Sequence, residues 1–189
     1  MPNLTDIFQQ VASLPNPTPG KKDKDAVREH VSTCLAAIEQ LKPGTRADYL
    51  SRLGRRARRH YSTVHRVAGK YAAAVALRVT GQNENLIRDF HHDAYYAVFF
   101  IARWALVSVG GYDCSFHQEI DALVESEIPK RDAAKAAMAG QLVSKLSEWR
   151  EERNLADYIM NPGRLNATPQ IIGQKNQDLI ALFGAWNIP

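Results

Sequence analysis

Residues 94–106 read Ala94-Tyr-Tyr-Ala-Val-Phe-Phe-Ile-Ala-Arg-Trp-Ala-Leu106. Drawn as a helix, this segment is apolar around nearly its whole circumference, and the pattern continues to Val107. A helix with this pattern is covered by neighbours on every side. We therefore expect a central helix over about residues 86–109, surrounded by other helices.

Helical periodicity also dominates the rest of the chain, and no run alternates between apolar and polar residues with the composition of a strand. The sequence therefore predicts an all-α protein. Proline and glycine mark the ends of its elements. The expected helices cover about residues 3–14, 23–41, 45–79 and 86–109, a short segment after residue 115, and residues 132–160 and 169–186.

Local signals place several of these helix ends. Two pairs have the spacing of a capping box at a helix start. They are Thr45 with Asp48 and Ser115 with Gln118. Pro129 is expected to separate the fifth helix from the sixth, because proline interrupts the helical hydrogen bonds. Thr168 followed by Pro169 is typical of an N-cap and a first helical position.

Composition limits the classes of protein that fit. The 189 residues are 45% apolar, which can bury the core of one domain, with or without a helical appendage. No run approaches the ~18 apolar residues of a membrane span, and the N-terminus lacks the pattern of a signal peptide. Cys34 and Cys114 are isolated and match neither a metal site nor a disulfide framework. We therefore expect a cytoplasmic protein without a membrane partner.

The net charge of +4 is unevenly distributed along the chain. Residues 49–83 contain eight Lys or Arg and no Asp or Glu, so the remaining residues sum to −4. On a helical wheel, a narrow apolar stripe runs along this segment and most basic residues lie opposite it. The stripe comprises Leu50, Leu53, Ala57, Tyr61, Val64, Ala68, Tyr71 and Val75. The opposite side, called the basic ridge below, comprises Arg52, Arg55, Arg56, Arg59, Arg66 and Lys70.

The basic ridge predicts nucleic-acid binding. It is about 27 Å long at ~1.5 Å per residue. Arginine suits phosphate because its planar fork of donors matches two phosphate oxygens. The alternatives are a solvated helix face or a face that meets acidic residues elsewhere in the chain. His60 and His65 are expected only to extend the polar side of this helix.

The central helix, with its Tyr95-Tyr96-Ala97 motif, resembles that of HEPN domains, helical bundles named for higher eukaryotes and prokaryotes nucleotide-binding. A second segment, Arg153-Asn-Leu-Ala-Asp-Tyr158, looks like the Arg-x4-6-His signature of that family. It lies near the end of a long expected helix and precedes a final amphipathic one. The resemblance covers about residues 86–186. It implies a HEPN-like helical bundle over residues 81–189, preceded by an N-terminal helical extension over residues 1–80 that contains the basic ridge.

The resemblance implies two functions. Many HEPN domains are metal-independent ribonucleases that act at a homodimer interface in toxin-antitoxin or defence systems. This implies a homodimer acting on RNA, with Arg153, Asn154 and Tyr158 at catalytic positions. Tyr158 occupies the histidine position, however, and tyrosine at pKa ~10 suits proton transfer near neutral pH less well than histidine at ~6.5. The alternative is a catalytically inactive interaction module that binds a nucleotidyltransferase, an antitoxin or another protein.

One apolar stripe of the expected sixth helix comprises Leu142, Leu146, Trp149, Ala156 and Met160. Arg153 falls on this stripe, so it is expected to point toward the packed side with Asp157 as its ion-pair partner. It either stabilises the fold or lines a groove between protomers and contacts phosphate. His91 or His92 could supply the missing proton transfer, and their ~100° separation on a helix allows at most one to point inward. No metal site or cofactor motif is expected.

Overall fold

The computed structural model describes residues 43–71, 84–111, 113–158 and 167–189. They form α3 (Pro43–Tyr71), α4 (Glu84–Gly110), α5 (Ile120–Arg131), the 3-10 helix η1 (Ala133–Lys135), α6 (Ala136–Tyr158) and α7 (Pro169–Ala185). No strand occurs in these four segments, which confirms the all-α prediction. The helices expected over residues 3–14 and 23–41, and the side chains Val75 and Met160, lie outside the described residues.

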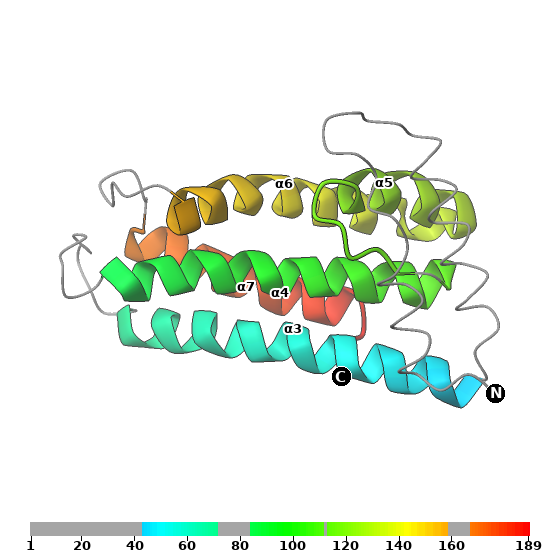
Figure 1. The fold of residues 1–189 in the computed structure, drawn as a ribbon, viewed down its shortest axis with the longest axis horizontal. Coiled ribbons are helices and arrows are strands. Elements are labelled where there is room, and N and C mark those ends of the chain that lie inside the picture. Colours follow the sequence, from blue (N-terminus) through cyan, green and yellow to red (C-terminus); the bar gives the residue numbers. More distant parts are fainter. Residues whose placement is uncertain (1–42, 72–83, 112, 159–166) are drawn as a thin grey trace.

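The central helix of the bundle is α4, as its apolar sequence predicts. In Figure 1 it crosses the middle of the molecule, with α3 on one side, α6 on the other and α7 behind it. Most of its residues are buried, and the side chains come from all sides of the helix. Phe90, Tyr95, Ile101 and Leu106 are fully buried on it. The core of the bundle is therefore built around α4.

The apolar stripe predicted for α3 is confirmed over the described part of that helix. Leu53, Ala57 and Val64 are buried, and the remaining members, Leu50, Tyr61, Ala68 and Tyr71, pack partly buried against the core. This stripe packs along α4 and α7. The opposite side of α3 therefore faces away from the bundle, which places the basic ridge on the surface.

Two long-range contacts fix α3 to the rest of the bundle. Arg46 donates hydrogen bonds to the carbonyls of Val107 (2.6 Å) and Ser108 (2.9 Å), near the C-terminal end of α4. The Val107 carbonyl also accepts from the Gly111 N–H (3.0 Å). Arg58 donates to the Ile188 carbonyl (2.7 Å), and its guanidinium lies 4.6 Å from the Phe183 ring centroid. These two basic residues of α3 are therefore structural.

The observed helix ends agree only in part with those predicted from the sequence. The Thr168 hydroxyl accepts a hydrogen bond from the Ile171 N–H (3.2 Å), and Pro169 is the first residue of α7, so both predictions are confirmed. The capping role of Thr45 was wrong, because α3 already begins at Pro43. Proline fits a first helical turn because its missing N–H has no intrahelical partner there.

The prediction for Pro129 was also wrong. It lies inside α5, in the last turn, where only one helical hydrogen bond is lost, and the break comes at Asp132, with φ −147° and ψ 89°. η1 follows the break, so α6 starts at Ala136 rather than near residue 132. Ser115 and Gln118 precede α5 without capping it, because the helix begins only at Ile120.

Candidate nucleic-acid interface

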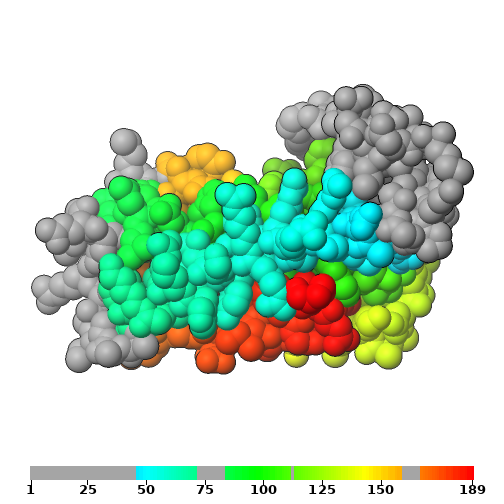
Figure 2. Space-filling model, turned by 90° about the horizontal axis from the view of Figure 1, so that it is seen from below, coloured from blue at the N-terminus to red at the C-terminus, as the bar shows by residue number. Residues whose placement is uncertain are grey.

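The basic ridge is exposed along α3. All six of its residues are classed as exposed. Figure 2 views the face along which α3 runs, with side chains of that helix projecting from its edge. The exposure predicted for these residues from the helical wheel is confirmed.

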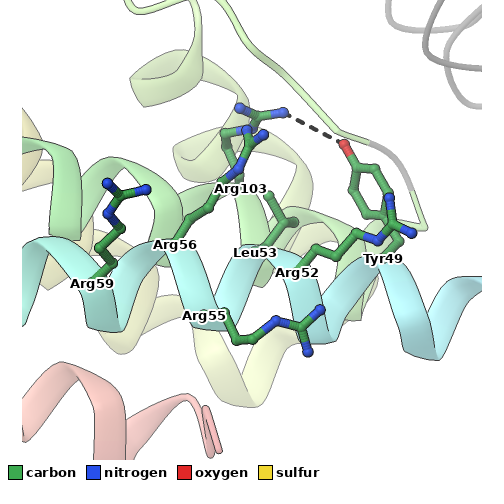
Figure 3. Close-up of a pocket in the computed structure, with 7 residues that line it drawn as sticks. All are labelled: Tyr49, Arg52, Leu53, Arg55, Arg56, Arg59 and Arg103. Carbon is green, nitrogen blue, oxygen red and sulfur yellow. Dashed lines mark hydrogen bonds between the residues drawn. The ribbon is translucent and has the colours of Figure 1, made fainter. Parts of the chain in front are cut away.

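Part of the ridge surrounds a surface hollow of about 480 Å³. This arginine hollow is lined by Tyr49, Arg52, Leu53, Arg55, Arg56, Arg59 and Arg103. Figure 3 shows Arg56 beside Arg103, Arg52 beside Tyr49, and Arg55 projecting from the other side of α3. Five guanidinium groups thus meet a small apolar wall, an arrangement whose chemistry suits an anion.

Among the residues that the structure describes, the four exposed arginines of the hollow have no acidic partner. Across the described segments, no carboxylate lies within 4.0 Å of the side-chain nitrogens of Arg52, Arg55, Arg56 or Arg59. Arg55 donates to the Ser51 hydroxyl (2.7 Å), and the Arg56 guanidinium lies 5.6 Å from the Phe100 ring centroid. Neither contact neutralises charge. The described residues therefore do not support the alternative of a face that meets acidic residues.

Beneath the exposed arginines lies a buried ion pair between Arg103 and Asp113. Arg103 Nε donates to Asp113 Oδ1 (2.8 Å), and both a second Arg103 nitrogen and the Tyr49 hydroxyl donate to Asp113 Oδ2. Burial, followed by the Asp113 charge, raises the pKa of Tyr49 far above its usual value. Burial alone would lower the pKa of Arg103, but Asp113 outweighs it and raises that pKa. The floor of the hollow thus keeps a charged guanidinium and a neutral phenol.

Arg153 points toward α4 and pairs with Asp157, as predicted. Its Nε lies 2.6 Å from Asp157 Oδ2, without hydrogen-bond geometry, and its side chain is 14% exposed. Its two other nitrogens donate to the Tyr96 hydroxyl (3.0 Å) and to Asn154 Oδ1 (3.1 Å). Tyr158, 71% exposed, places its ring 5.4 Å from the guanidinium. The structure therefore brings together the three positions that the resemblance names, and phosphate contact by Arg153 stays a prediction.

The two adjacent histidines of α4 have different surroundings. His91 is 1% exposed, and its Nδ1 lies 3.1 Å from Glu152 Oε2, which also accepts from the buried Lys175 amine. His92 is 41% exposed, and its Nδ1 lies 3.1 Å from Asp157 Oδ1. The prediction that at most one of them points inward is confirmed. Only His92 shares a partner with Arg153, whereas His91 belongs to a separate buried cluster.

Two further histidines lie near Tyr96. His60 of α3 bonds Asp93 through Nδ1 (2.6 Å) and stacks on the Tyr96 ring, so it does more than extend the polar side of its helix. His60 lies three residues after Ala57 and four before Val64, which are both fully buried. This spacing places His60 beside the apolar stripe of α3, and could have predicted that its side chain contacts the neighbouring helix. His117, in the loop before α5, bonds the Tyr95 hydroxyl (2.7 Å). No sequence signal marked His117.

The site has no sign of metal chemistry in the ranges that the structure covers, where no three His, Cys, Asp or Glu side chains are grouped to hold an ion. No described helix is both long and apolar enough to cross a membrane. Neither family models, curated proteins nor solved structures yield a match to this chain. These comparisons therefore assign no function to the site.

Proposed function

We propose that the protein binds RNA, and that the arginine hollow with the adjoining basic ridge contacts the phosphates. One observation carries the proposal. Four exposed arginines lie between residues 52 and 59 of one helix, and no carboxylate of the described segments pairs with them. Arg66 and Lys70 extend the same side of α3 by three more turns.

Electrostatics favours a polyanion at this place. Arg52 with Arg56, and Arg55 with Arg59, are like charges at positions i and i+4, and each such pair destabilises a helix by about 0.2–0.5 kcal/mol. Arg103 adds a further positive group at the floor, although Asp113 balances its charge. A chain of phosphates would relieve this repulsion, and guanidinium forks bind phosphate oxygens in pairs.

RNA is the nucleic acid that we favour, because residues 86–186 resemble HEPN domains. The apolar wall of Tyr49 and Leu53 beside the arginines also suits a partly unstacked single strand, which presents sugar and base faces together with phosphates.

A second candidate, an inactive module that binds a protein partner, is favoured by the surroundings of Arg153. All three of its side-chain nitrogens face side chains of its own chain. A guanidinium held in this way has less capacity to bind an incoming phosphate. The arginine hollow is independent of Arg153, so the same experiment separates the two candidates.

The experiment measures the anisotropy of a labelled single-stranded RNA in EDTA over a series of salt concentrations. Four phosphate contacts predict a slope of log K against log salt of about −3 for a single strand. The double variant Arg56→Glu with Arg59→Glu should lose most of the affinity. The matched control is Lys130→Glu with Lys135→Glu, which changes the net charge equally and lies on α5 and η1, away from α3.

Equal weakening by the two double variants would show that only net charge matters, and would overturn the interface. Absence of binding by the unmodified protein would overturn RNA binding itself and leave the protein-binding module. Binding that is lost in the ridge variant and kept in the control supports the proposal.

A further inference from the structure

One guanidinium at the floor of the arginine hollow is buried and still has a nitrogen to offer. Arg103 is 8% exposed, and its Nε and Nη2 donate to Asp113. No described residue accepts a hydrogen bond from its third nitrogen, Nη1, and this atom is not among the fully buried nitrogens without a partner. Nη1 is therefore accessible, and a ligand atom reaches it from the hollow that Arg103 lines.

The position of that nitrogen is fixed before any ligand arrives. Asp113 holds one edge of the Arg103 guanidinium through two nitrogens, and Nη2 also donates to the Tyr49 hydroxyl (3.4 Å). The Phe100 ring centroid lies 5.4 Å from the same guanidinium. A group held in this way loses little freedom when it binds an anion.

The rim of the hollow adds guanidinium groups that are not paired. No described residue accepts a hydrogen bond from the guanidinium groups of Arg52, Arg56 or Arg59, and Figure 3 shows Arg56 beside Arg103. Among the described carboxylates, only Asp113 lies within 4.0 Å of any of the five guanidinium groups that line the hollow. Five positive charges against one negative charge leave an excess of four.

This excess is concentrated over a short length of α3. Arg52 and Arg59 are about 10 Å apart along the helix axis, a length over which a stacked strand offers about three internal phosphates with one charge each. A terminal phosphomonoester carries about −1.5 to −2 at pH 7 and has three acceptor oxygens on one phosphorus. A strand that ends in such a group therefore matches the hollow better than an uninterrupted strand does.

The depth of the hollow also favours a strand end. An internal phosphate has a sugar on both sides, so the strand must fold back on itself to bring that phosphate to Arg103 Nη1. A terminal phosphate is attached on one side only and enters alone. The volume of about 480 Å³ is typical of sites that enclose small ligands, and the wall of Tyr49 and Leu53 is available to the attached sugar or base.

We propose that the arginine hollow binds the terminal phosphomonoester of an RNA strand, an inference that rests on the proposed RNA binding and names the class of RNA. Arg103 Nη1 contacts the terminal phosphate from the floor, and Arg52 and Arg56 contact it from the rim. The strand then follows the basic ridge, where Arg66 and Lys70 contact internal phosphates. The same chemistry occurs at a 5′-phosphate, at a 3′-phosphate and in a free nucleotide, and the experiment separates these sources.

The test compares single-stranded RNAs of one sequence as competitors of a labelled RNA in EDTA. One has a 5′-phosphate, one a 3′-phosphate and one a hydroxyl at both ends. A hydroxyl-ended RNA that is one nucleotide longer carries the added charge as an internal phosphate. One phosphorylated RNA should bind about tenfold or more tightly than both hydroxyl-ended RNAs, the gain from one further charge-assisted hydrogen bond. Adenosine 5′-monophosphate should bind about 100-fold more weakly than that RNA, because it lacks the contacts along the ridge.

Two variants that each remove one exposed arginine locate the preference for the phosphorylated end. Arg56→Gln should reduce this preference to about threefold or less, because Arg56 lines the hollow. The matched control is Arg66→Gln, on the same ridge but outside the hollow, which should weaken all the RNAs by the same factor and keep the preference. Arg103→Met with Asp113→Asn removes the floor guanidinium together with its counter-charge, and should also reduce the preference. A melting scan checks that this double variant is folded.

Equal affinity for phosphorylated and hydroxyl-ended RNA would overturn recognition of the end and leave RNA binding intact. Binding of none of the RNAs would overturn the proposed function as well. A nucleotide that binds as tightly as the phosphorylated strand would overturn the assignment to RNA. Equal loss of the preference in Arg56→Gln and Arg66→Gln, or its full retention in the folded double variant, would overturn the placement in the hollow.

Discussion

Replacing Asp113 with asparagine removes the charge that balances Arg103 at the floor of the arginine hollow. The Asp113 carboxylate accepts two hydrogen bonds from Arg103 and one from Tyr49, and the side chains of the ion pair are each 10% exposed. In Asp113→Asn, a buried guanidinium loses its counter-charge while the volume of the side chain is kept. Breaking a buried pair in this way costs about 3–5 kcal/mol.

For a chain of this length, 1 kcal/mol shifts the melting temperature by about 2–4 °C. Asp113→Asn should therefore melt about 6–20 °C below the unmodified protein in a calorimetric or circular dichroism scan at neutral pH. The comparison is Glu127→Gln, which removes the charge of a partly exposed carboxylate 3.9 Å from Lys130 Nζ and 3.8 Å from Arg131 Nε and should cost less than about 1 kcal/mol.

A double variant tests the reasoning itself. Arg103→Met with Asp113→Asn removes both charges and leaves an amide oxygen to accept the Tyr49 hydroxyl, so it should recover at least half of the lost stability. The reasoning fails if Asp113→Asn melts within about 4 °C of the unmodified protein, or if the double variant is the less stable of the two.

Two further predictions concern groups close to the same loop. Burial raises the pKa of Cys114 to about 12, so at pH 8 only about one thiol in ten thousand is ionised. In a Cys34→Ser background, Cys114 should resist a thiol reagent until urea unfolds the protein, and rapid labelling of the native state would contradict this. Burial, with three nearby arginines, lowers the pKa of His117 to about 4, below the ~6.5 of an unfolded chain. The stabilising contribution of neutral His117 should be complete above pH ~6.5 and lost as the pH falls toward 4. NMR should therefore find His117 neutral at pH 6. In His117→Gln, the free energy of unfolding should decrease less between pH ~6.5 and pH ~4 than in the unmodified protein.

The fold class and the central helix could be predicted from the sequence because the signals are local. The apolar residues around α4 indicate its burial on every side, and Thr168 with Pro169 fixes the start of α7 within a single turn. Pro129 shows the limit of such reasoning. A proline in the last turn of a helix interrupts few hydrogen bonds, so the helix can continue past it. How far the helix continues after the proline cannot be predicted from the sequence alone.

The exposed side of the site could be predicted and its interior could not. The basic ridge follows from the helical wheel of α3 alone. The ion pair beneath it joins Tyr49 to Asp113 over 64 positions, and the bond between His92 and Asp157 spans 65. Pairing over such separations depends on how the helices pack, and periodicity along one helix contains no information about that. His117 was missed for this reason, since only the packing of its loop brings it to Tyr95.

The hydrogen bonds from Arg46 to the end of α4 have a consequence for the kinetics of the proposed RNA binding. They join the first turns of α3 to α4, and the buried contact of Tyr49 with Asp113 and Arg103 joins the same two helices one turn later. The backbone beneath the arginine hollow is thus ordered when the protein folds, before any anion arrives. Only the exposed side chains remain to be ordered on binding, at about 0.5–1.5 kcal/mol each. Association should then proceed as a single diffusive encounter, whose rate depends on ionic strength and not on a rearrangement of the helices.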